Sequence, residues 1–218
     1  MKATYHHGRL KEALIDVAMD FIAEKGVEKL TLKVLAEGTG TTRSAIYKHF
    51  ANKEALIEAV IVEGLDKFDA EVTEMFFDEK RSLMDRFYLA GKAYITFAKK
   101  NPNLYKLIFG DEYAHLREAL FSLKDDSCSS FFRLKCTVEE AQEKGVFKKE
   151  NAELQAIAIW SSLHGLSMIL IGGFMEVHAQ DEDAFDTIFA TLLLGMASSK
   201  VKLISTVPFI NRLLEVEK

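Results

Sequence analysis

The chain has 218 residues, of which 49% are hydrophobic and 28% are charged, and its formal net charge is −5. Its two prolines and twelve glycines amount to about half of the roughly 12% share that these residues usually have. This scarcity excludes collagen-like, turn-rich all-β and Pro/Gly-rich disordered proteins. The balance of apolar and charged residues indicates a globular protein of one or two domains.

The compartment follows from the cysteines and from the start of the chain. Cys128 and Cys136 form no C-x-x-C pair, so we expect neither a disulfide framework nor a structural zinc site. The segment from Lys2 to Arg9 is polar, with no apolar stretch behind it that would make a secretory signal. We therefore expect a protein of the reducing cytoplasm.

Charge is distributed unevenly along the chain. Residues 1–53 carry nine Lys and Arg against six Asp and Glu, a net charge of +3, whereas residues 54–218 carry nineteen against twenty-seven, a net of −8. The average therefore hides a small basic head on an acidic body. Such a head is compatible with a surface that meets phosphate, although local excursions of this size are common.

Helical periodicity dominates the first third. An apolar stripe at helical spacing begins at Leu10 and ends at Ile22, with Gly26 as the C-terminal stop. Thr31 is positioned to cap a short second helix, and Thr42 a third of about two turns. Asn52 caps a fourth helix that reaches Phe76 or Phe77, and the Gly38-Thr39-Gly40 segment separates the second helix from the third.

The remainder also predicts helices, and no run of alternating β-branched residues competes with them. We expect helices over 82–100, from Pro102 onward, over 126–144 with a stop at Gly145, over 154–175 and over 183–197. The last stretch, 201–218, is interpreted as a docked tail or a short final helix. The predicted fold is all-α, with a three-helix head and a C-terminal helical bundle. The boundary lies near residue 53, giving domains 1–53 and 54–218 joined by the helix over 53–77.

One helix raises the question of a membrane. The 22 residues from Leu154 to Met175 contain no Asp, Glu, Lys or Arg, which is long enough to span a bilayer. Polar residues such as Gln155 and His164 interrupt the stretch, and no second span or basic flank accompanies it. We favour a helix buried between its own domain and a partner subunit, and we expect its Trp160 to be buried.

Residues 31–50 match a helix-turn-helix pattern, in which two short helices are joined by a Gly-containing turn. On the second helix, Ile46 and Phe50 are four residues apart and are expected to face inward. The outward rows then carry hydroxyls and positive charges without a carboxylate: Arg43 with Tyr47, and Ser44 with Lys48. This surface suits a helix in the major groove, and the alternative is a helical hairpin with a solvated polar face.

A family resemblance strengthens the DNA-binding interpretation. The head resembles the DNA-binding head of the TetR family of bacterial repressors through the run Gly26-x4-Thr31-x3-Leu35-Ala36-x3-Gly40-x-Thr42-x3-Ile46-Tyr47-x-His49-Phe50-x-Asn52-Lys53-Glu54-x-Leu56. Trp160-x3-His164-Gly165 with Gly172 resembles the subgroup whose regulatory domain has a Trp-His-Gly signature, as does the opening Tyr5-His6-His7-Gly8-x-Leu10. The turn, Gly38-Thr39-Gly40-Thr41-Thr42, departs from the family's usual Ala-Ala-Gly-Val-Ser.

The resemblance implies DNA-contacting residues at the start of the third helix and around the fourth. They are Thr42, Arg43, Ser44, Ala45, Tyr47, Lys48, His49 and Lys53. Tyr47 matches the family's phosphate-binding tyrosine, and its alternative role is packing. Lys53 lies in the first turn of a helix, where the dipole already favours phosphate. His49 is either a contact or a support for the helix, and Tyr5 to Gly8 either an arm along the backbone or disordered without DNA.

The resemblance also implies a ligand pocket between the body helices. Aromatic residues at helical spacing suit a flat or apolar small molecule. The candidate ligand-binding residues are Trp160, His164, Phe97, Tyr94, Phe131 and Tyr105. For each of them the alternative is an ordinary place in the core, and for His164 a satisfied core histidine.

The predicted function is a ligand-responsive repressor that binds double-stranded DNA at an inverted-repeat operator as a homodimer, with no membrane partner. The helices over 154–175 and 184–196 should form a four-helix dimer interface, where Gly172, Gly173, Ala190 and Gly195 allow close approach. We find no P-loop, G-x-S-x-G, H-E-x-x-H or dinucleotide motif, so we expect no enzyme, cofactor or metal site. The alternatives are a helical small-molecule-binding adaptor without DNA binding and a small helical enzyme.

Overall fold

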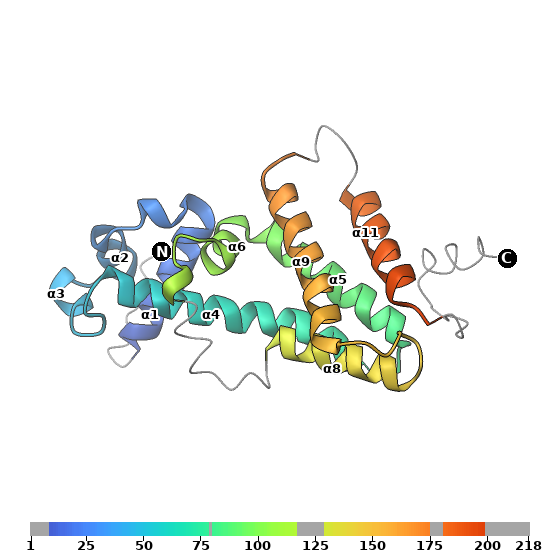
Figure 1. Ribbon diagram of the computed structural model, residues 1–218. Helices are drawn as coiled ribbons and strands as arrows, with labels where there is room; N and C mark the ends of the chain where they lie inside the picture. The colour runs from blue at the N-terminus through green and yellow to red at the C-terminus, as the bar shows by residue number, and fades with distance from the viewer. Residues whose placement is uncertain (1–8, 79, 117–128, 175–180, 199–218) are drawn as a thin grey trace. The chain divides into compact units, whose positions relative to one another are not determined.

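The computed structural model describes residues 9–78, 80–116, 129–174 and 181–198, and within these ranges the regular elements are helices (Figure 1). The α-helices are α1 (Leu10–Lys25), α2 (Leu32–Thr39), α3 (Arg43–Ile46), α4 (Lys53–Thr73), α5 (Leu83–Lys100), α6 (Pro102–Phe109), α8 (Ser130–Glu143), α9 (Ala152–Ile171) and α11 (Asp181–Met196). Short 3₁₀ turns, η1 (Val27–Lys29) and η2 (Glu74–Phe76), follow α1 and α4. The expected all-α fold is confirmed. The tail over 201–218 and the arm from Tyr5 to Gly8 lie outside the described residues.

The chain forms two compact units. The first contains residues up to Lys67 together with Asn101–Lys124, and the second contains Phe68–Lys100 together with the residues from Asp125 onward. Helix α6 is therefore part of the first unit, where it packs against α1, and the Asn103 amide donates a hydrogen bond of 3.0 Å to the Ala23 carbonyl. The functional division at residue 53 remains a prediction.

Side-chain caps set the helix starts in the first unit. The Thr31 hydroxyl accepts a hydrogen bond from the Val34 N–H, and the Thr42 hydroxyl accepts one from the Ala45 N–H, both at 3.3 Å. The Asn52 side chain accepts a 2.8 Å bond from the Ala55 N–H at the start of α4. These three caps are the predicted ones. The third helix is shorter than the expected two turns, since α3 has four residues and is followed by turn residues from Tyr47 to His49.

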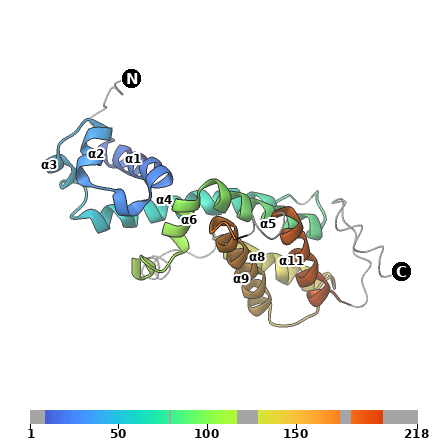
Figure 2. The same cartoon turned by 90° about the horizontal axis from the view of Figure 1, so that it is seen from above.

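The second unit is a bundle around α5. This helix buries Phe87, Tyr94 and Phe97, and α9 packs against α5, α8 and α11 (Figure 2). Helix α8 begins at Ser130 with Ser129 as its cap, later than the predicted Asp126. A bundle of this kind encloses its apolar side chains without any sheet.

The end of α11 is fastened by main-chain bonds. The Lys148 N–H donates to the Met196 carbonyl at 2.8 Å, and the Ser198 N–H donates to the Val146 carbonyl at 2.9 Å. These bonds form an isolated antiparallel bridge between Phe147 and Ala197. The segment that follows α8 therefore holds the C-terminal end of α11.

Helix α9 is only partly buried within the protomer. Leu154, Ile157, Met168 and Ile169 are exposed large apolar residues on it, and Trp160 is 37% exposed. Trp160 is thus partly exposed in the single protomer, because nothing in the protomer covers this face of the helix. Its burial between this domain and a partner subunit remains a prediction. Among the described helices, α9 alone is long and apolar enough to cross a membrane, which by itself is weak evidence for a span.

One ion pair ties the bundle together. The guanidinium of Arg86, a buried residue of α5, donates to both carboxylate oxygens of Glu140 on α8 at 2.7 and 2.8 Å. It also donates to the Phe76 carbonyl at 3.1 Å. Burial raises the pKa of Glu140, but hydrogen bonds and positive charge from Lys144 and Arg86 outweigh burial and lower that pKa overall. The carboxylate therefore stays ionised and neutralises the buried cation.

We expect Glu140→Gln to destabilise the protein by about 2 kcal/mol, because the Arg86 charge would stay buried without its counter-ion. This figure lies below that of a fully buried pair, since the Glu140 side chain is 33% exposed. Urea unfolding monitored by circular dichroism measures the change. A loss under about 0.5 kcal/mol would show that the pair is dispensable.

Lys144→Met is the matched control, because Lys144 also pairs with Glu140 but its side chain is 60% exposed. It should cost at most about 0.5 kcal/mol. Since the native pKa of Glu140 is lowered, its contribution is complete above its ordinary value of 4.5 and is lost as the pH falls through the native pKa. The difference between the intact protein and Glu140→Gln should therefore shrink in acid.

Candidate nucleic-acid interface and ligand pocket

The turn between α2 and α3 needs a left-handed residue. Gly40 ends α2 with φ of +65°, a backbone conformation that costs other residues free energy because of the Cβ atom. The N–H of Thr41 donates to the Ala36 carbonyl at 2.9 Å and closes the end of the helix. Thr42 then caps α3, and its hydroxyl lies 3.0 Å from that of Ser44. The orientation of α3 is thus determined by local hydrogen bonds.

Helix α2 also approaches α1 closely at Gly38. A Cβ atom built on Gly38 would lie 2.6 Å from Cγ1 of Val17, which is well inside van der Waals contact. Gly38 therefore sets the separation of α1 and α2, and the position of α3 depends on it through the turn.

The surface of α3 matches the predicted orientation. Ile46 is 1% exposed and Phe50 is 4% exposed, so both point into the core of the first unit. The exposed side chains of residues 42–49 are Thr42, Arg43, Ser44, Tyr47, Lys48 and His49. Tyr47 is 55% exposed, which makes its phenol available to a partner rather than part of the packing. No carboxylate interrupts this surface between Thr42 and His49, so it can donate hydrogen bonds to phosphate oxygens and base edges.

Ala45 and Lys53 are less exposed than these residues. Ala45 is half-buried, and the Lys53 ammonium donates a 3.3 Å hydrogen bond to the Val27 carbonyl. The Lys53 charge is therefore held in place at the start of α4. A phosphate there would meet the ammonium together with the free N–H groups of the helix terminus.

Acidic and aromatic groups surround the same helix start in the first unit. The Glu54 carboxylate lies 2.8 Å from Nε2 of His115. Burial raises the pKa of Tyr113, with further contributions from the negative charges of Glu112, Glu28 and Glu54 and from its hydrogen bond to Glu112. The Tyr113 phenol is consequently neutral at physiological pH. In the part of the chain that is described, no group of three or more His, Cys, Asp or Glu could hold a metal ion.

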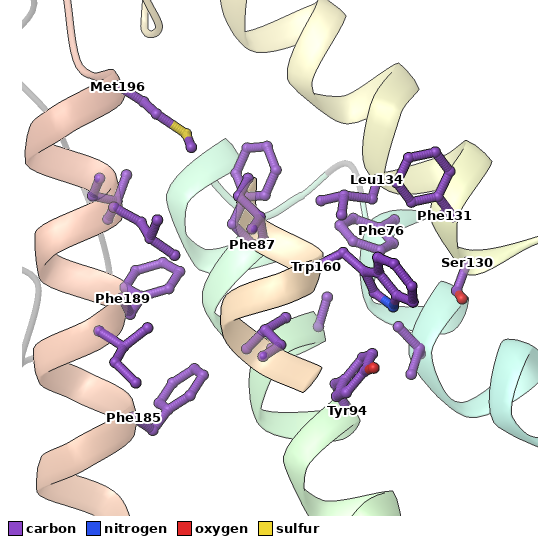
Figure 3. Close-up of a pocket in the computed structure, with 18 of the residues that line it drawn as sticks. Phe76, Phe87, Tyr94, Ser130, Phe131, Leu134, Trp160, Phe185, Phe189 and Met196 are labelled. Atoms are coloured by element: carbon purple, nitrogen blue, oxygen red, sulfur yellow. The ribbon is translucent and has the colours of Figure 1, made fainter. Parts of the chain in front are cut away.

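The second unit encloses an apolar pocket (Figure 3). The cavity has a volume of about 50 Å³, which is room for a few waters. The lining residues come from α4, η2, α5, α8, α9, α11 and the segment after α8: Val72, Phe76, Phe87, Ala90, Gly91, Tyr94, Ser130, Phe131, Leu134, Phe147, Ile159, Trp160, Leu163, Phe185, Ile188, Phe189, Leu192, Leu193 and Met196. Nearly all of them are aromatic or aliphatic, which is typical of a site for a small organic ligand.

The structure brings three of the six sequence-predicted ligand residues to this pocket: Tyr94, Phe131 and Trp160. The rings of Phe131 and Trp160 meet edge to face, with centroids 6.2 Å apart. His164 stacks on Trp160 with centroids 5.9 Å apart, but it does not line the pocket.

Phe97 and Tyr105 lie elsewhere. Phe97 is fully buried and packs edge to face against Phe68, with centroids 5.2 Å apart. Tyr105 is fully buried in the first compact unit, next to Phe109. Neither is among the pocket residues, and a ligand-binding role for the predicted set remains a prediction.

Sequence reasoning missed the wall that α11 provides. Phe185, Phe189 and Met196 line the pocket from this helix, and the rings of Phe185 and Phe189 stack with centroids 5.8 Å apart. Their spacing of four residues on a predicted helix was a visible signal. Periodicity gives the buried face of a helix but not what lies opposite that face.

Two family models match the chain. Residues 14–60 match bacterial regulatory proteins of the tetR family, and residues 87–193 match a tetracyclin repressor-like C-terminal domain. The first match covers α2, α3 and the turn between them, and the second covers most of the pocket lining.

Individual relatives are more distant. The nucleoid occlusion factor SlmA of Vibrio cholerae is 28% identical over 102 residues, which cover 47% of this chain and 52% of that protein. The HTH-type transcriptional repressor ComR of Escherichia coli is 32% identical over 94 residues, covering 42% and 45%. The chain thus spans about half the length of these two curated relatives. A solved protein of unknown function from Rhodococcus sp. RHA1 shares the fold, with a TM-score of 0.73, 24% identity and coverage of 90% and 100%.

We expect Gly38→Ala to destabilise the first unit by about 1–3 kcal/mol, because the new methyl group would overlap Val17. Thermal unfolding measures the effect. The double variant Val17→Ala with Gly38→Ala removes the overlapping methyl groups of Val17 and should recover part of the loss beyond the sum of the two single changes. Additive losses would show that the close contact does not limit this position.

Proposed function

The chain belongs to the TetR family of bacterial regulatory proteins, and on this premise we propose that it is a DNA-binding transcriptional repressor. A small apolar or aromatic molecule would release it from its operator DNA. The observation that carries the DNA-binding part is the exposed surface of α3, which offers Arg43, Ser44, Tyr47 and Lys48 without a carboxylate. The repressor ComR, which is 32% identical over its aligned part, supports the direction of regulation. The site that regulates release is the apolar pocket of the second unit.

Each DNA contact has a distinct role in this proposal. The residues at the start of α3, Thr42 to Ala45, approach base edges and neighbouring phosphates. Tyr47 and Lys48 bind the phosphate backbone, and Lys53 adds charge at the start of α4. His49 is exposed and lies beside them as a contact or as a support.

The regulatory unit has features of the subgroup with the Trp-His-Gly signature. Trp160 and His164 stack on each other, and Trp160 also lines the pocket. We place the chain in this subgroup. Ligand in the pocket would favour an arrangement of the body in which the two heads of a dimer no longer match the two half-sites, which is a shift of population between two states.

Dimerisation would use the exposed face of α9. The apolar residues Leu154, Ile157 and Met168 are 63%, 40% and 37% exposed, and Leu194 of α11 is 44% exposed. A second copy would cover this face in a self-complementary interface. Gly172 and Gly195 are exposed and allow close approach, whereas Ala190 is 8% exposed and packs within its own protomer. Ala190 would therefore contribute little surface to this interface.

Helix α9 packs in the bundle of the second unit, so we place the protein in the cytoplasm rather than in a membrane. The alternative function is a helical small-molecule-binding adaptor without DNA binding, and it differs from a regulator in having no affinity for a DNA duplex.

Tyr47→Phe should weaken operator binding by about 1 kcal/mol per head, because a hydrogen bond to a charged phosphate is lost. A duplex selected from random sequence by the intact protein serves as the probe, and a gel-shift titration at physiological salt measures affinity. Tyr88→Phe is the matched control, since it removes a phenol hydroxyl from the second unit, which carries none of the proposed DNA contacts. Equal affinities for the intact protein and Tyr47→Phe would remove Tyr47 from the interface.

Ile157→Glu should convert the dimer into a monomer of 24.6 kDa, because a buried carboxylate without a partner opposes association. Light scattering at micromolar concentration gives the mass. Phe77→Glu is the matched control: Phe77 is 58% exposed and apolar but lies after η2 rather than on α9 or α11. A monomeric intact protein, or a loss of mass in both variants, would contradict the proposed interface.

A further inference from the structure

The lining of the pocket in the second unit contains no Asp, Glu, Lys, Arg or His. Ionic groups just outside the lining have partners of their own: Arg86 pairs with Glu140, Lys92 lies 3.9 Å from Asp186, and the Asp69 carboxylate accepts a 2.9 Å hydrogen bond from the Ser130 N–H. An ionised ligand would therefore lose its hydration without finding a counter-ion in the lining, and the free-energy cost of that transfer is large. The pocket selects against carboxylates and ammonium groups.

The shape of the lining favours a flat ring. Eight of its nineteen residues are aromatic: Phe76, Phe87, Tyr94, Phe131, Phe147, Trp160, Phe185 and Phe189. Phe87 and Phe147 stack with centroids 5.3 Å apart, as Phe185 and Phe189 do at 5.8 Å. An aromatic ligand gains offset or edge-to-face contacts with such rings beyond simple burial.

The few polar atoms of the lining lie on one side. In Figure 3 the indole nitrogen of Trp160 and the hydroxyl oxygens of Ser130 and Tyr94 lie on the side of the pocket away from α11, which carries Phe185 and Phe189. The indole N–H only donates, and the Ser130 hydroxyl both donates and accepts. A ligand hydroxyl there could accept from Trp160 and donate to Ser130.

We propose that this pocket widens beyond its present volume of about 50 Å³ and binds an uncharged aromatic molecule of one or two rings that carries a hydroxyl group, with the rings among the phenylalanines and the hydroxyl toward Trp160 and Ser130. The inference rests on the proposed function in taking this pocket as the regulatory site. It adds the chemical class of the ligand and the residues that select it.

Three naphthalenes of similar shape test the class by calorimetry on the intact protein without DNA. We expect 2-naphthol to bind, 2-methylnaphthalene to bind about tenfold more weakly because it lacks the hydrogen bonds, and 2-naphthoate to bind at least about 30-fold more weakly. Binding of 2-naphthoate as tight as that of 2-naphthol would overturn the proposal. So would equal affinities for 2-naphthol and 2-methylnaphthalene.

Two mild substitutions separate recognition from packing. Ser130→Ala and Trp160→Phe should each lower the affinity for 2-naphthol by about fivefold. Ser130→Ala should leave the affinity for 2-methylnaphthalene unchanged. Trp160→Phe should bring the affinities for 2-naphthol and 2-methylnaphthalene closer together. A substitution that acts only through packing lowers both affinities equally, and that result would overturn the assignment of the polar groups. Ala90→Leu, which fills the pocket, should abolish binding of both ligands, and retained binding would place the site elsewhere.

Release of the DNA duplex that the intact protein selects from random sequence is a second measurement, and it distinguishes a failure of this proposal from a failure of the proposed function. If 2-naphthoate releases DNA while 2-naphthol neither binds the protein nor releases DNA, the proposed ligand class is wrong and the proposed function as a regulator stands. If 2-naphthol binds in the calorimeter with the expected selectivity and DNA stays bound, the ligand class is supported and the release mechanism fails. Release of DNA at the concentrations at which 2-naphthol binds supports both.

Discussion

The packing of the second unit depends on how the charge of Arg86 is accommodated. Helix α5 packs against α9 and η2, its Tyr88 ring contacts Phe185 of α11, and it contributes four residues to the pocket. The Arg86 side chain is therefore only 8% exposed to water. The two hydrogen bonds from Nη2 of Arg86 to the Glu140 carboxylate and the bond from Nη1 to the Phe76 carbonyl connect α5 to α8 and to the end of η2. Phe76 and Phe87 meet edge to face beside this network. The network thus holds α5, α8 and η2, three of the elements that line the pocket, in fixed positions relative to one another.

The head is governed by local rules, and for that reason much of it could be predicted. Caps at Thr31, Thr42 and Asn52 and a stop at Gly26 depend on residues a few positions apart, so the sequence alone indicates them. The inward positions of Ile46 and Phe50 follow from a spacing of four. What local rules could not show is the contact between Gly38 and Val17, because it joins residues 21 positions apart on different helices. That contact explains why position 38 is glycine where the family usually has alanine, because a Cβ atom there would overlap Val17.

The body was harder to predict, since its site is made by long-range packing. Aromatic spacing identified Tyr94, Phe131 and Trp160, but equally Phe97 and Tyr105, which are fully buried away from the pocket. A core and a cavity use the same residue types, and only the packing of neighbouring helices distinguishes them. Trp160 shows the same limit in another form. A helix without charged residues suggested burial on every side, yet the single protomer leaves its indole partly exposed.

The fastening of α11 has a consequence for how such a pocket can change. The bonds that join the segment after α8 to the end of α11 run from Lys148 N–H to the Met196 carbonyl and from Ser198 N–H to the Val146 carbonyl. They involve backbone atoms alone, so they do not depend on which side chains α11 directs into the pocket. Substitutions at Phe185, Phe189 or Met196 could therefore reshape the interior while the wall keeps its attachment. The atoms that hold α11 in place are thus distinct from the side chains that line the pocket, so the lining can change by substitution while the fold is kept.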